Sequence, residues 1–253
     1  MISITADPLP EPEKQSEKFR GRVAVITGAS RGIGAAIARA LAAQACDLVL
    51  TSRNQEQLYS LARNLSIGDL RVTAKTCDIG KADSVESLFA MIRSEFGKID
   101  VLVNNAGTSH AMANVEQLSL EAWHESINTN LTGTFLVTRA ALPLMSAGST
   151  IVNNLSVAAR TAFAGEAGYC ASKHGALGFT NTLREELRPK GIRVVSLIAG
   201  PTNTEIWTQF WPDAPREKMM SPVTVARAVV DALLLPANST VDELTIMPTA
   251  GAL

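Results

Sequence analysis

The chain alternates short apolar runs with longer segments in which apolar residues recur at helical spacing. The first run, residues 22–27, is rich in β-branched residues, which is typical of a parallel strand buried on both faces. The segment after it, residues 35–44, has the periodicity of a helix with one apolar face. Because strand and helix patterns alternate to the end with no break in composition, the sequence predicts one α/β domain.

The predicted strands cover residues 22–27, 70–76, 99–107, 151–156 and 243–248, and residues 47–54 and 192–204 each hold a further strand and its exit. The predicted helices cover residues 35–44, 55–64, 81–96, 118–145 and 223–235, and a further helix carries Tyr169 and Lys173. Residues 1–19 are rich in proline and charge and lack the apolar core of a signal peptide. We expect a flexible extension there, or a brace for a neighbouring subunit, and a single catalytic domain over residues 20–253.

Composition narrows the class of protein. The 253 residues are 46% hydrophobic and 19% charged, as in soluble globular proteins. A net charge of −1 gives no electrostatic footprint for nucleic acid or an anionic membrane, and no apolar run is long enough to span a bilayer. Cys46, Cys77 and Cys170 have neither zinc-site spacing nor a disulfide pattern, which favours the reducing cytoplasm.

A glycine-rich turn, GASRGIG, joins the first predicted strand to the first predicted helix. Gly28 suits a tight turn, Gly32 lets the backbone approach a pyrophosphate at the helix N-terminus, and Gly34 lets the helix pack against the strand. Ser30 and Ile33 lie in the same turn. The spacing is GxxxGxG rather than the standard GxGxxG, and the alternative interpretation is an ordinary helix-capping turn.

The exit of the second predicted strand indicates which dinucleotide would bind. Proteins that select NAD carry an acidic residue near this point, whereas this chain has Thr51, Ser52 and Arg53. A guanidinium attracts a 2′-phosphate and can hold it with two hydrogen bonds, and Arg31 in the glycine turn can reach the same group. We therefore predict NADP(H). The alternative is that both arginines are solvated loop charges.

Two further strand exits carry candidate cofactor contacts. Asp78 can accept a hydrogen bond from an adenine amino group, or it caps the helix over residues 81–96. Asn105, Ala106 and Gly107 end the fourth strand, where small and amide residues let a flat ring approach the backbone. The alternative for the asparagines is that they satisfy loop carbonyl groups.

The long helical pattern over residues 118–145 contains Asn130, with Gly133 three positions later. Both residues disfavour a helix interior, and such a local conflict is expected at functional positions. Asn130 is predicted to bend the helix or to hold a water molecule. Asn128 is a rival for that role.

A serine, a tyrosine and a lysine form the candidate catalytic unit. Tyr169 and Lys173 are four residues apart, which places both on one helical face. A nearby ammonium group favours the phenolate and would suit Tyr169 to acid–base work. Ser156 ends an apolar strand, where ligands bind in open α/β sheets. The alternative for the tyrosine and lysine is a solvated surface pair.

The segment after the sixth strand concentrates aromatic residues. Trp207, Phe210 and Trp211 lie close together among prolines, which predicts a mobile lid over an apolar substrate or a contact with a partner subunit. His110, after the NNAG turn, lines the pocket or is an ordinary loop residue.

The motifs TGASRGIG, NNAG and YCASK, with Asn130 and Ser156 between them, resemble the short-chain dehydrogenase/reductase family in order and spacing. The resemblance covers the chain from Gly21 onward. It implies a doubly wound (Rossmann) α/β fold, a parallel seven-stranded sheet with helices on both faces and the cofactor across the strand ends.

The resemblance also implies residue roles. Tyr169 would donate the proton to the carbonyl oxygen, and Lys173 would bind the nicotinamide ribose and lower the tyrosine pKa. Ser156 would hydrogen-bond the substrate oxygen, and Asn130 would hold a water in the proton relay. The implied cofactor contacts are Asp78 and Asn105 on the adenosine side, Thr202 and Thr204 near the nicotinamide, and the pair Arg31 and Arg53 of NADP-preferring members.

Two positions depart from the family pattern. The usual Pro-Gly after the sixth strand is replaced by Ala199-Gly200-Pro201, which bears on the carboxamide contacts because proline fixes φ and removes a donor. Leu155 stands where a second serine is common.

The expected function is NADP(H)-dependent hydride transfer between nicotinamide and a ketone or secondary alcohol. The resemblance favours 3-oxoacyl thioesters or broad carbonyl reduction, with sugar, steroid and hydroxy-amino-acid substrates as alternatives. A non-catalytic NADP-binding sensor is a further hypothesis, although such a protein would be expected to lose Tyr169 or Lys173. The family implies a homodimer or homotetramer built on the helices that carry Asn130 and Tyr169.

Overall fold

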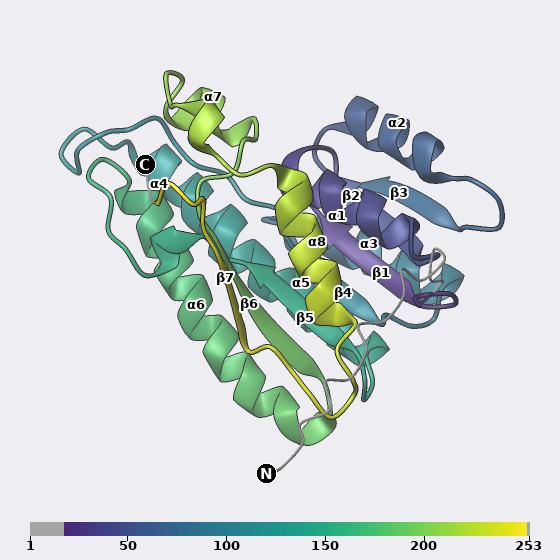
Figure 1. Cartoon of the computed structure of the whole chain (residues 1–253). Helices are drawn as coiled ribbons and strands as arrows, with labels where there is room; N and C mark the ends of the chain where they lie inside the picture. The colour runs from purple at the N-terminus through teal and green to yellow at the C-terminus, as the bar shows by residue number, and fades with distance from the viewer. Residues whose placement is uncertain (1–17, 252–253) are drawn as a thin grey trace, which may run out of the picture.

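A seven-stranded parallel sheet in the order β3-β2-β1-β4-β5-β6-β7 forms the centre of the computed structural model, which describes residues 18–251 (Figure 1). The strands are β1 (Val23–Thr27), β2 (Asp47–Ser52), β3 (Val72–Thr76), β4 (Val101–Asn104), β5 (Thr150–Asn154), β6 (Arg193–Ala199) and β7 (Glu243–Ile246). The strand order reverses between β1 and β4, which is where a doubly wound sheet opens a crevice for ligands. The predicted fold class is confirmed.

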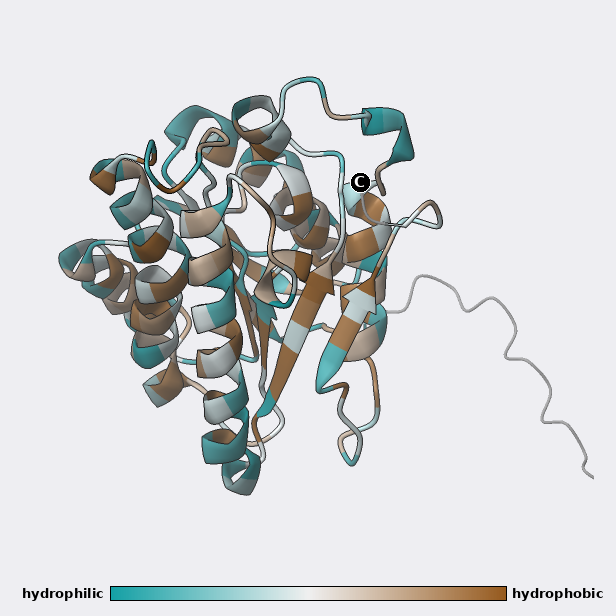
Figure 2. Cartoon of the chain, turned by 90° about the vertical axis from the view of Figure 1, so that its left-hand side faces the viewer, coloured by the Kyte–Doolittle hydropathy of each residue, from teal (hydrophilic) through white to brown (hydrophobic). Residues whose placement is uncertain are grey.

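Helices cover both faces of this sheet. They are α1 (Gly32–Ala42), α2 (Gln55–Leu65), α3 (Ala82–Glu95), α4 (Leu120–Ile127), α5 (Thr134–Ala141), α6 (Ala167–Leu187), α7 (Ile206–Phe210) and α8 (Pro222–Leu233). Alternate side chains of a strand point to opposite faces. In β1, Ala24 and Ile26 join the core under α1, α2 and α8, while Val23 and Val25 join the core under α3, α5 and α6. Figure 2 shows apolar residues concentrated on the strands between these two layers.

Several strands are shorter than predicted. β4 ends at Asn104, whereas the predicted strand runs to residue 107, and β6 ends at Ala199, which leaves residues 200–204 as the predicted exit of that strand. The polar and small residues after each end leave the ladder and form the loops at the carboxyl edge of the sheet, where a ligand has access to their backbone.

The predicted single helix over residues 118–145 is wrong. The segment divides into α4, a π-helical turn over Asn128–Gly133, α5 and a final 3-10 turn over Leu142–Leu144. The two positions with unfavourable helix propensity, Asn130 and Gly133, both lie in the π turn. A π turn inside a helix is a local insertion that often accompanies functional sites.

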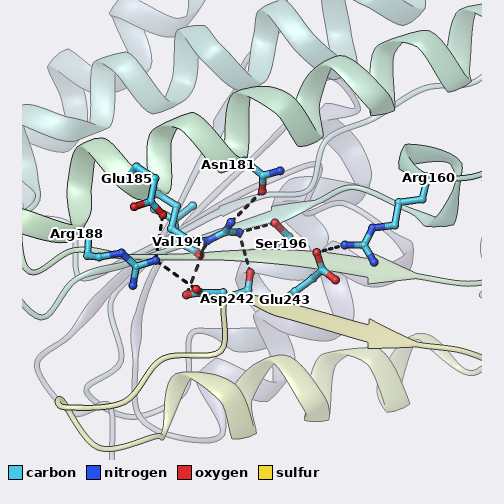
Figure 3. Close-up of polar contacts among 9 residues, drawn as sticks. Arg160, Asn181, Glu185, Arg188, Val194, Ser196, Asp242 and Glu243 are labelled. Carbon is cyan, nitrogen blue, oxygen red and sulfur yellow. Dashed lines mark hydrogen bonds and ion pairs between the residues drawn. The ribbon is translucent and has the colours of Figure 1, made fainter.

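Polar contacts fasten the C-terminal half of α6 to the sheet (Figure 3). The Arg184 guanidinium donates to the carbonyl oxygen of Val194 at 2.9 Å and to Ser196 Oγ at 2.7 Å, both on β6. It also donates to the carbonyl oxygen of Asp242, just before β7, at 2.8 Å. Arg188 pairs with the Asp242 carboxylate at 3.3 Å. These contacts fix the helix whose first turns carry Tyr169 and Lys173.

The N-terminal boundary of the domain differs from the predicted one. The predicted extension over residues 1–19 lies outside the described residues except for Lys18 and Phe19. The Phe19 side chain is fully buried in the core under α1, and its N–H donates to the carbonyl oxygen of Gln44 at 3.1 Å. Phe19 therefore belongs to the folded domain. Among the described residues, we find no helix with the length and apolar character needed to cross a membrane.

Candidate active site

A cleft of about 760 Å³ opens at the carboxyl ends of the strands, where the switch point of the sheet lies. It brings together side chains and backbone from segments far apart in the sequence. The predicted site residues that line it are Gly28, Ser30, Arg31, Gly32, Ile33, Arg53, Asp78, Asn105, Ala106, Gly107, Ser156, Tyr169, Lys173, Thr202 and Thr204. Two predicted site residues, Gly34 and Asn130, lie behind its wall instead.

The three glycine positions of the turn have little or no room for a side chain. Gly28 has φ of +63°, and a Cβ there would lie 2.7 Å from the Cα of Ala106. Gly32 has φ of +56° and faces Thr204, whose Cγ2 would lie 3.1 Å from an added Cβ. Gly34 is buried against the turn, with 2.4 Å between an added Cβ and the carbonyl oxygen of Gly28. The backbone is therefore accessible to an anion at the N-terminus of α1, where no side chain caps the helix.

Thr27 and Asn105 brace this turn. The Thr27 hydroxyl accepts from the N–H groups of Asn105 and Ala106, each at 3.0 Å. The Asn105 amide donates to the carbonyl oxygens of Thr27 and Gly28 at 3.0 and 3.1 Å, and its oxygen accepts from Asn154 at 2.9 Å. These bonds match the alternative that this asparagine satisfies loop carbonyls. Its predicted adenosine contact stays a prediction.

The two arginines lie at the end of the cleft that adjoins β2. Arg31 is exposed, and its side chain has no hydrogen-bond or ion-pair partner among the described residues. Arg53 contacts Glu125 at 3.3 Å, and both side chains are about half exposed. Exposed ion pairs stabilise a protein by only roughly 0–1 kcal/mol. Arg53 can therefore leave Glu125 and bind an anionic ligand instead.

Asp78 lines the cleft near these arginines and is not the cap of α3. Its Oδ1 accepts from the N–H of Gly80 at 3.1 Å, within the turn that precedes the helix. The N-cap position of α3 is Lys81, which makes no side-chain capping bond. The alternative that Asp78 caps this helix is therefore wrong.

Ser156, Tyr169 and Lys173 converge on the other half of the cleft. Lys173 is 6% exposed, and its ammonium group donates to the carbonyl oxygen of Asn154 at 2.9 Å. It lies 5.6 Å from the centroid of the Tyr169 ring. The tyrosine and lysine are therefore not a solvated surface pair.

Burial controls the acid–base properties of this unit. Burial raises the pKa of Tyr169 to about 12, and this effect outweighs a hydrogen bond with Ser156 that lowers the pKa. It also lowers the pKa of Lys173 to about 8. The expectation that Lys173 lowers the tyrosine pKa is thus not met in the protein alone, because loss of hydration disfavours both charged forms. At neutral pH the pair holds a neutral phenol and an ammonium group, the state that can donate a proton.

Asn130 supports this unit from behind. It is 2% exposed, and its side chain accepts from the N–H of Thr108 at 2.8 Å and donates to the Thr108 carbonyl oxygen at 2.9 Å. It also donates to Ser172 Oγ, on the helix that carries Tyr169, at 2.9 Å. The rival Asn128 is exposed. Asn130 thus links the π turn, the loop after β4 and α6, and its predicted water-holding role stays a prediction.

The aromatic segment lies beside the cleft. Trp207, Phe210 and Trp211 all line it, and the Trp207 ring is 5.1 Å from Phe210 and 6.4 Å from Trp211, centroid to centroid. The Trp207 indole donates to the carbonyl oxygen of Thr202 at 2.8 Å, which ties α7 to the end of β6. The two predicted roles of this segment, a mobile lid over an apolar substrate and a contact with a partner subunit, stay predictions.

Ser109 and Glu166 are among the residues of the site that sequence reasoning missed. Glu166 lines the cleft three positions before Tyr169, and Ser109 Oγ donates to its Oε2 at 3.0 Å. No motif marks either position, because the contact joins residues 57 positions apart. His110 is buried and lies under the first turn of α6, so it does not line the pocket.

Ser156 has a backbone conformation that strains a residue with a Cβ. Its φ of +90° and ψ of 157° fall in a region used almost only by glycine, at a cost of about 1–3 kcal/mol. Ser156→Gly and Ser156→Ala both remove the hydroxyl, but only glycine relieves the strain. Glycine also increases the conformational entropy of the unfolded chain, which reduces this gain in stability by about 0.4–1 kcal/mol. We expect urea unfolding to show Ser156→Gly more stable than Ser156→Ala by about 1 kcal/mol.

Both variants are expected to lose roughly 100-fold in turnover, because one donor to the developing oxyanion is removed. Equal stability of the two variants would show that the Ser156 backbone is unstrained.

The chain is similar to known dehydrogenases over most of its length. The family model for short chain dehydrogenases matches residues 22–215. D-threitol dehydrogenase of Mycolicibacterium smegmatis is 38% identical over 201 residues, which cover 79% of this chain and 76% of that protein. An uncharacterised oxidoreductase of Staphylococcus haemolyticus is 32% identical over 91% of this chain and 99% of its own length.

Solved structures agree with these relatives. An alcohol dehydrogenase of the archaeon Thermococcus sibiricus, complexed with 5-hydroxy-NADP, is 33% identical with a TM-score of 0.85, covering 92% of this chain and 98% of its own. A serine dehydrogenase in its closed form with NADP⁺ is 30% identical with a TM-score of 0.83, covering 91% and 96%. With its fold, its cleft and these matches, the chain belongs to the short-chain dehydrogenase family.

Proposed function

We propose that this protein is an NADP(H)-dependent oxidoreductase that interconverts a ketone and the corresponding secondary alcohol. The observation that carries the proposal is the meeting of Ser156, Tyr169 and Lys173 with the glycine turn in one cleft. The solved relatives complexed with NADP⁺ or 5-hydroxy-NADP support the choice of dinucleotide.

The chain has a suitable place for each part of the cofactor. The uncapped N-terminus of α1, with Gly28 and Gly32 free of side chains, suits the pyrophosphate. Arg31 and Arg53 suit a 2′-phosphate. Lys173 reaches the wall of the cleft and can donate to ribose hydroxyl groups. When bound, NADPH supplies the hydride, and the protein supplies position and electrostatics.

The protein's own groups handle the carbonyl oxygen and the proton. The hydroxyls of Ser156 and Tyr169 lie together and would hydrogen-bond the substrate oxygen, stabilising the negative charge that develops there. Tyr169, protonated at neutral pH, donates the proton. The Lys173 ammonium group stabilises the charge left behind. Asn130 holds the first turn of α6 in place through Ser172.

The substrate is the finer part of the proposal. The sequence resemblance favoured a 3-oxoacyl thioester or broad carbonyl reduction, and the cleft volume admits either class. Relatives named as dehydrogenases of threitol, serine and an alcohol support a compact substrate that carries a hydroxyl group. We propose broad carbonyl reduction, with small ketones as the first substrates to test.

Measuring NADPH and NADH oxidation separately against a panel of ketones and 3-oxoacyl thioesters tests this function. We expect turnover with NADPH. Arg31→Ala and Arg53→Ala should each raise the KM for NADPH about tenfold, since a hydrogen bond to a charged group is worth about 1.5–3 kcal/mol, and leave the KM for NADH unchanged.

Arg63→Ala is the matched control, because Arg63 is exposed on α2 and does not line the cleft. Faster turnover with NADH than with NADPH would overturn the choice of cofactor. Binding of NADPH without turnover of any carbonyl or alcohol would favour the sensor hypothesis instead.

The proposed assembly is a homodimer or homotetramer. Trp123 on α4 and Phe135 on α5 are 36% and 41% exposed, which supports an interface on these helices.

A further inference from the structure

Glu166 is an acidic residue held rigidly beside Tyr169. It occupies the N-cap position of α6 and is 1% exposed. Its backbone pairs with Ala113 of the loop after β4, and the N–H of Ala113 donates to the carbonyl oxygen of Gly165 at 3.0 Å. The side chain therefore has a fixed place between the loop after β4 and the segment before α6, both of which line the cleft.

The two oxygens of this carboxyl group differ. Oε2 accepts from Ser109 Oγ at 3.0 Å, whereas Oε1 is buried and has no hydrogen-bond partner among the described residues. None of the ion pairs found among the described residues includes Glu166, and Lys173 donates to a backbone carbonyl instead. A buried acceptor without a partner is unfavourable in a native protein. Oε1 is thus suited to a ligand that brings a donor.

The surroundings indicate where that donor would lie. The other acidic residues of the cleft lie elsewhere: Asp78 follows β3, Glu125 contacts Arg53, and the carboxylate of Glu205 faces Gly32. Of these acidic residues, only Glu166 contributes to the raised pKa of the Tyr169 phenol. Helix positions three apart have Cβ atoms about 5–6 Å apart, which a carbonyl oxygen and a hydroxyl on a neighbouring carbon can bridge.

Apolar side chains also line the cleft. They include Met112, Phe163 and the aromatic side chains of α7. A substrate that is apolar throughout would cover Oε1 without satisfying it, and a site with a buried unpaired polar group discriminates strongly against such a ligand. Burial also raises the pKa of Glu166 to about 7, so the surroundings disfavour a full charge there and suit a neutral donor.

We propose that Glu166 is a substrate-recognition residue whose Oε1 accepts a hydrogen bond from a hydroxyl group next to the reacting carbonyl. The substrates are then α-hydroxy ketones, and vicinal diols in the direction of oxidation, rather than 3-oxoacyl thioesters. This inference rests on the proposed carbonyl reductase function. It adds a binding role to the acid–base unit of Ser156, Tyr169 and Lys173.

A matched pair of ketones tests the inference: 3-hydroxy-2-butanone and 3-methyl-2-butanone, which differ by a hydroxyl in place of a methyl. At saturating NADPH we expect the protein to prefer the hydroxy ketone in kcat/KM by at least about tenfold. Glu166→Leu should remove this preference by raising the KM for the hydroxy ketone, with little change for its methyl counterpart. A merely structural role would slow both substrates alike.

Glu205→Leu is the control, because this acidic residue also lines the cleft but lies beside the glycine turn. Any change in NADPH affinity affects kcat/KM for both ketones alike and cancels in the ratio of the two values. Glu166→Gln keeps the shape of the side chain and should lose most of the preference, because its oxygen stays with Ser109. The glutamine variant tests the proposed contact of Oε1 if the leucine variant does not fold.

Reduction of both ketones with equal kcat/KM, or a preference that survives in both Glu166 variants, would overturn the inference and leave the oxidoreductase intact. Turnover of 3-oxoacyl thioesters alone would do the same. A preference for an amino ketone over the hydroxy ketone would assign Oε1 to a cation and also overturn it. No NADPH-dependent turnover of any of these compounds would instead contradict the proposed function itself.

Discussion

Tyr169→Phe is expected to lower kcat/KM for carbonyl reduction by a factor of about 10²–10⁴, the usual contribution of a positioned general acid. The change removes one oxygen atom and keeps the ring, so the packing of α6 is preserved. Affinity for NADPH should stay within about threefold, because the glycine turn and the two arginines are untouched. Steady-state kinetics and a fluorescence titration with NADPH measure the two quantities.

The reason for the large effect lies in the protonation states. Burial raises the pKa of Tyr169 to about 12, so the phenol is protonated throughout the working range and can donate. Burial lowers the pKa of Lys173 to about 8, so its ammonium group is lost as the pH rises through that value. We therefore expect reduction by the unmodified protein to slow above about pH 8, because the charge that stabilises the tyrosinate disappears.

Tyr59→Phe is the matched control. The chain has two tyrosines, and Tyr59 is 39% exposed on α2, away from the cleft. Its variant should keep full activity. A Tyr169→Phe protein with more than a third of the original kcat/KM would mean that another group donates the proton.

Gly34→Ala is expected to damage both stability and cofactor binding. An added Cβ would lie 2.4 Å from the carbonyl oxygen of Gly28 and 2.4 Å from Asn105 Nδ2, and neither atom is free to move. The Gly28 carbonyl accepts from Asn105, and that same amide also holds Thr27. Overpacking of this kind costs about 1–3 kcal/mol, which lowers the melting temperature of a chain this long by roughly 2–12 °C.

The same clash displaces the turn that would cradle the pyrophosphate. We expect NADPH affinity to fall at least tenfold, as measured by titration of the folded variant below its melting temperature. Gly178→Ala is the control: it is exposed in α6, an added Cβ there meets no atom within 4 Å, and alanine is about 0.8–1 kcal/mol more favourable in a helix. Normal NADPH affinity in Gly34→Ala would show that the turn tolerates displacement.

Sequence patterns were most informative where the relevant contacts are local. The strand and helix periods, the GASRGIG turn and the spacing of Tyr169 and Lys173 each depend on residues close together in the chain. Local geometry follows from such short windows, since backbone dihedral preferences and helical spacing act over a few residues. This is why the fold class could be predicted, and why most of the predicted site residues do line the cleft.

The helix over residues 118–145 shows where this reasoning fails. The apolar pattern continues through Asn130, so the sequence indicates one helix, with only a conflict of propensity to mark the position. The break is a π turn whose asparagine bonds to Thr108 and Ser172, more than 20 positions away in each direction. Those partners come from other elements, and only the packed fold brings them to Asn130.

By itself, then, the sequence determined the doubly wound fold, the glycine-rich turn, and the types of group that meet in the cleft. The tertiary structure alone decided their chemical state and surroundings. Burial sets the directions of the Tyr169 and Lys173 pKa shifts, and the amount of water excluded depends on segments packed from the whole chain. Glu166 beside the tyrosine likewise depends on a loop from after β4, because Ser109 holds one of its oxygens and leaves the other for a ligand.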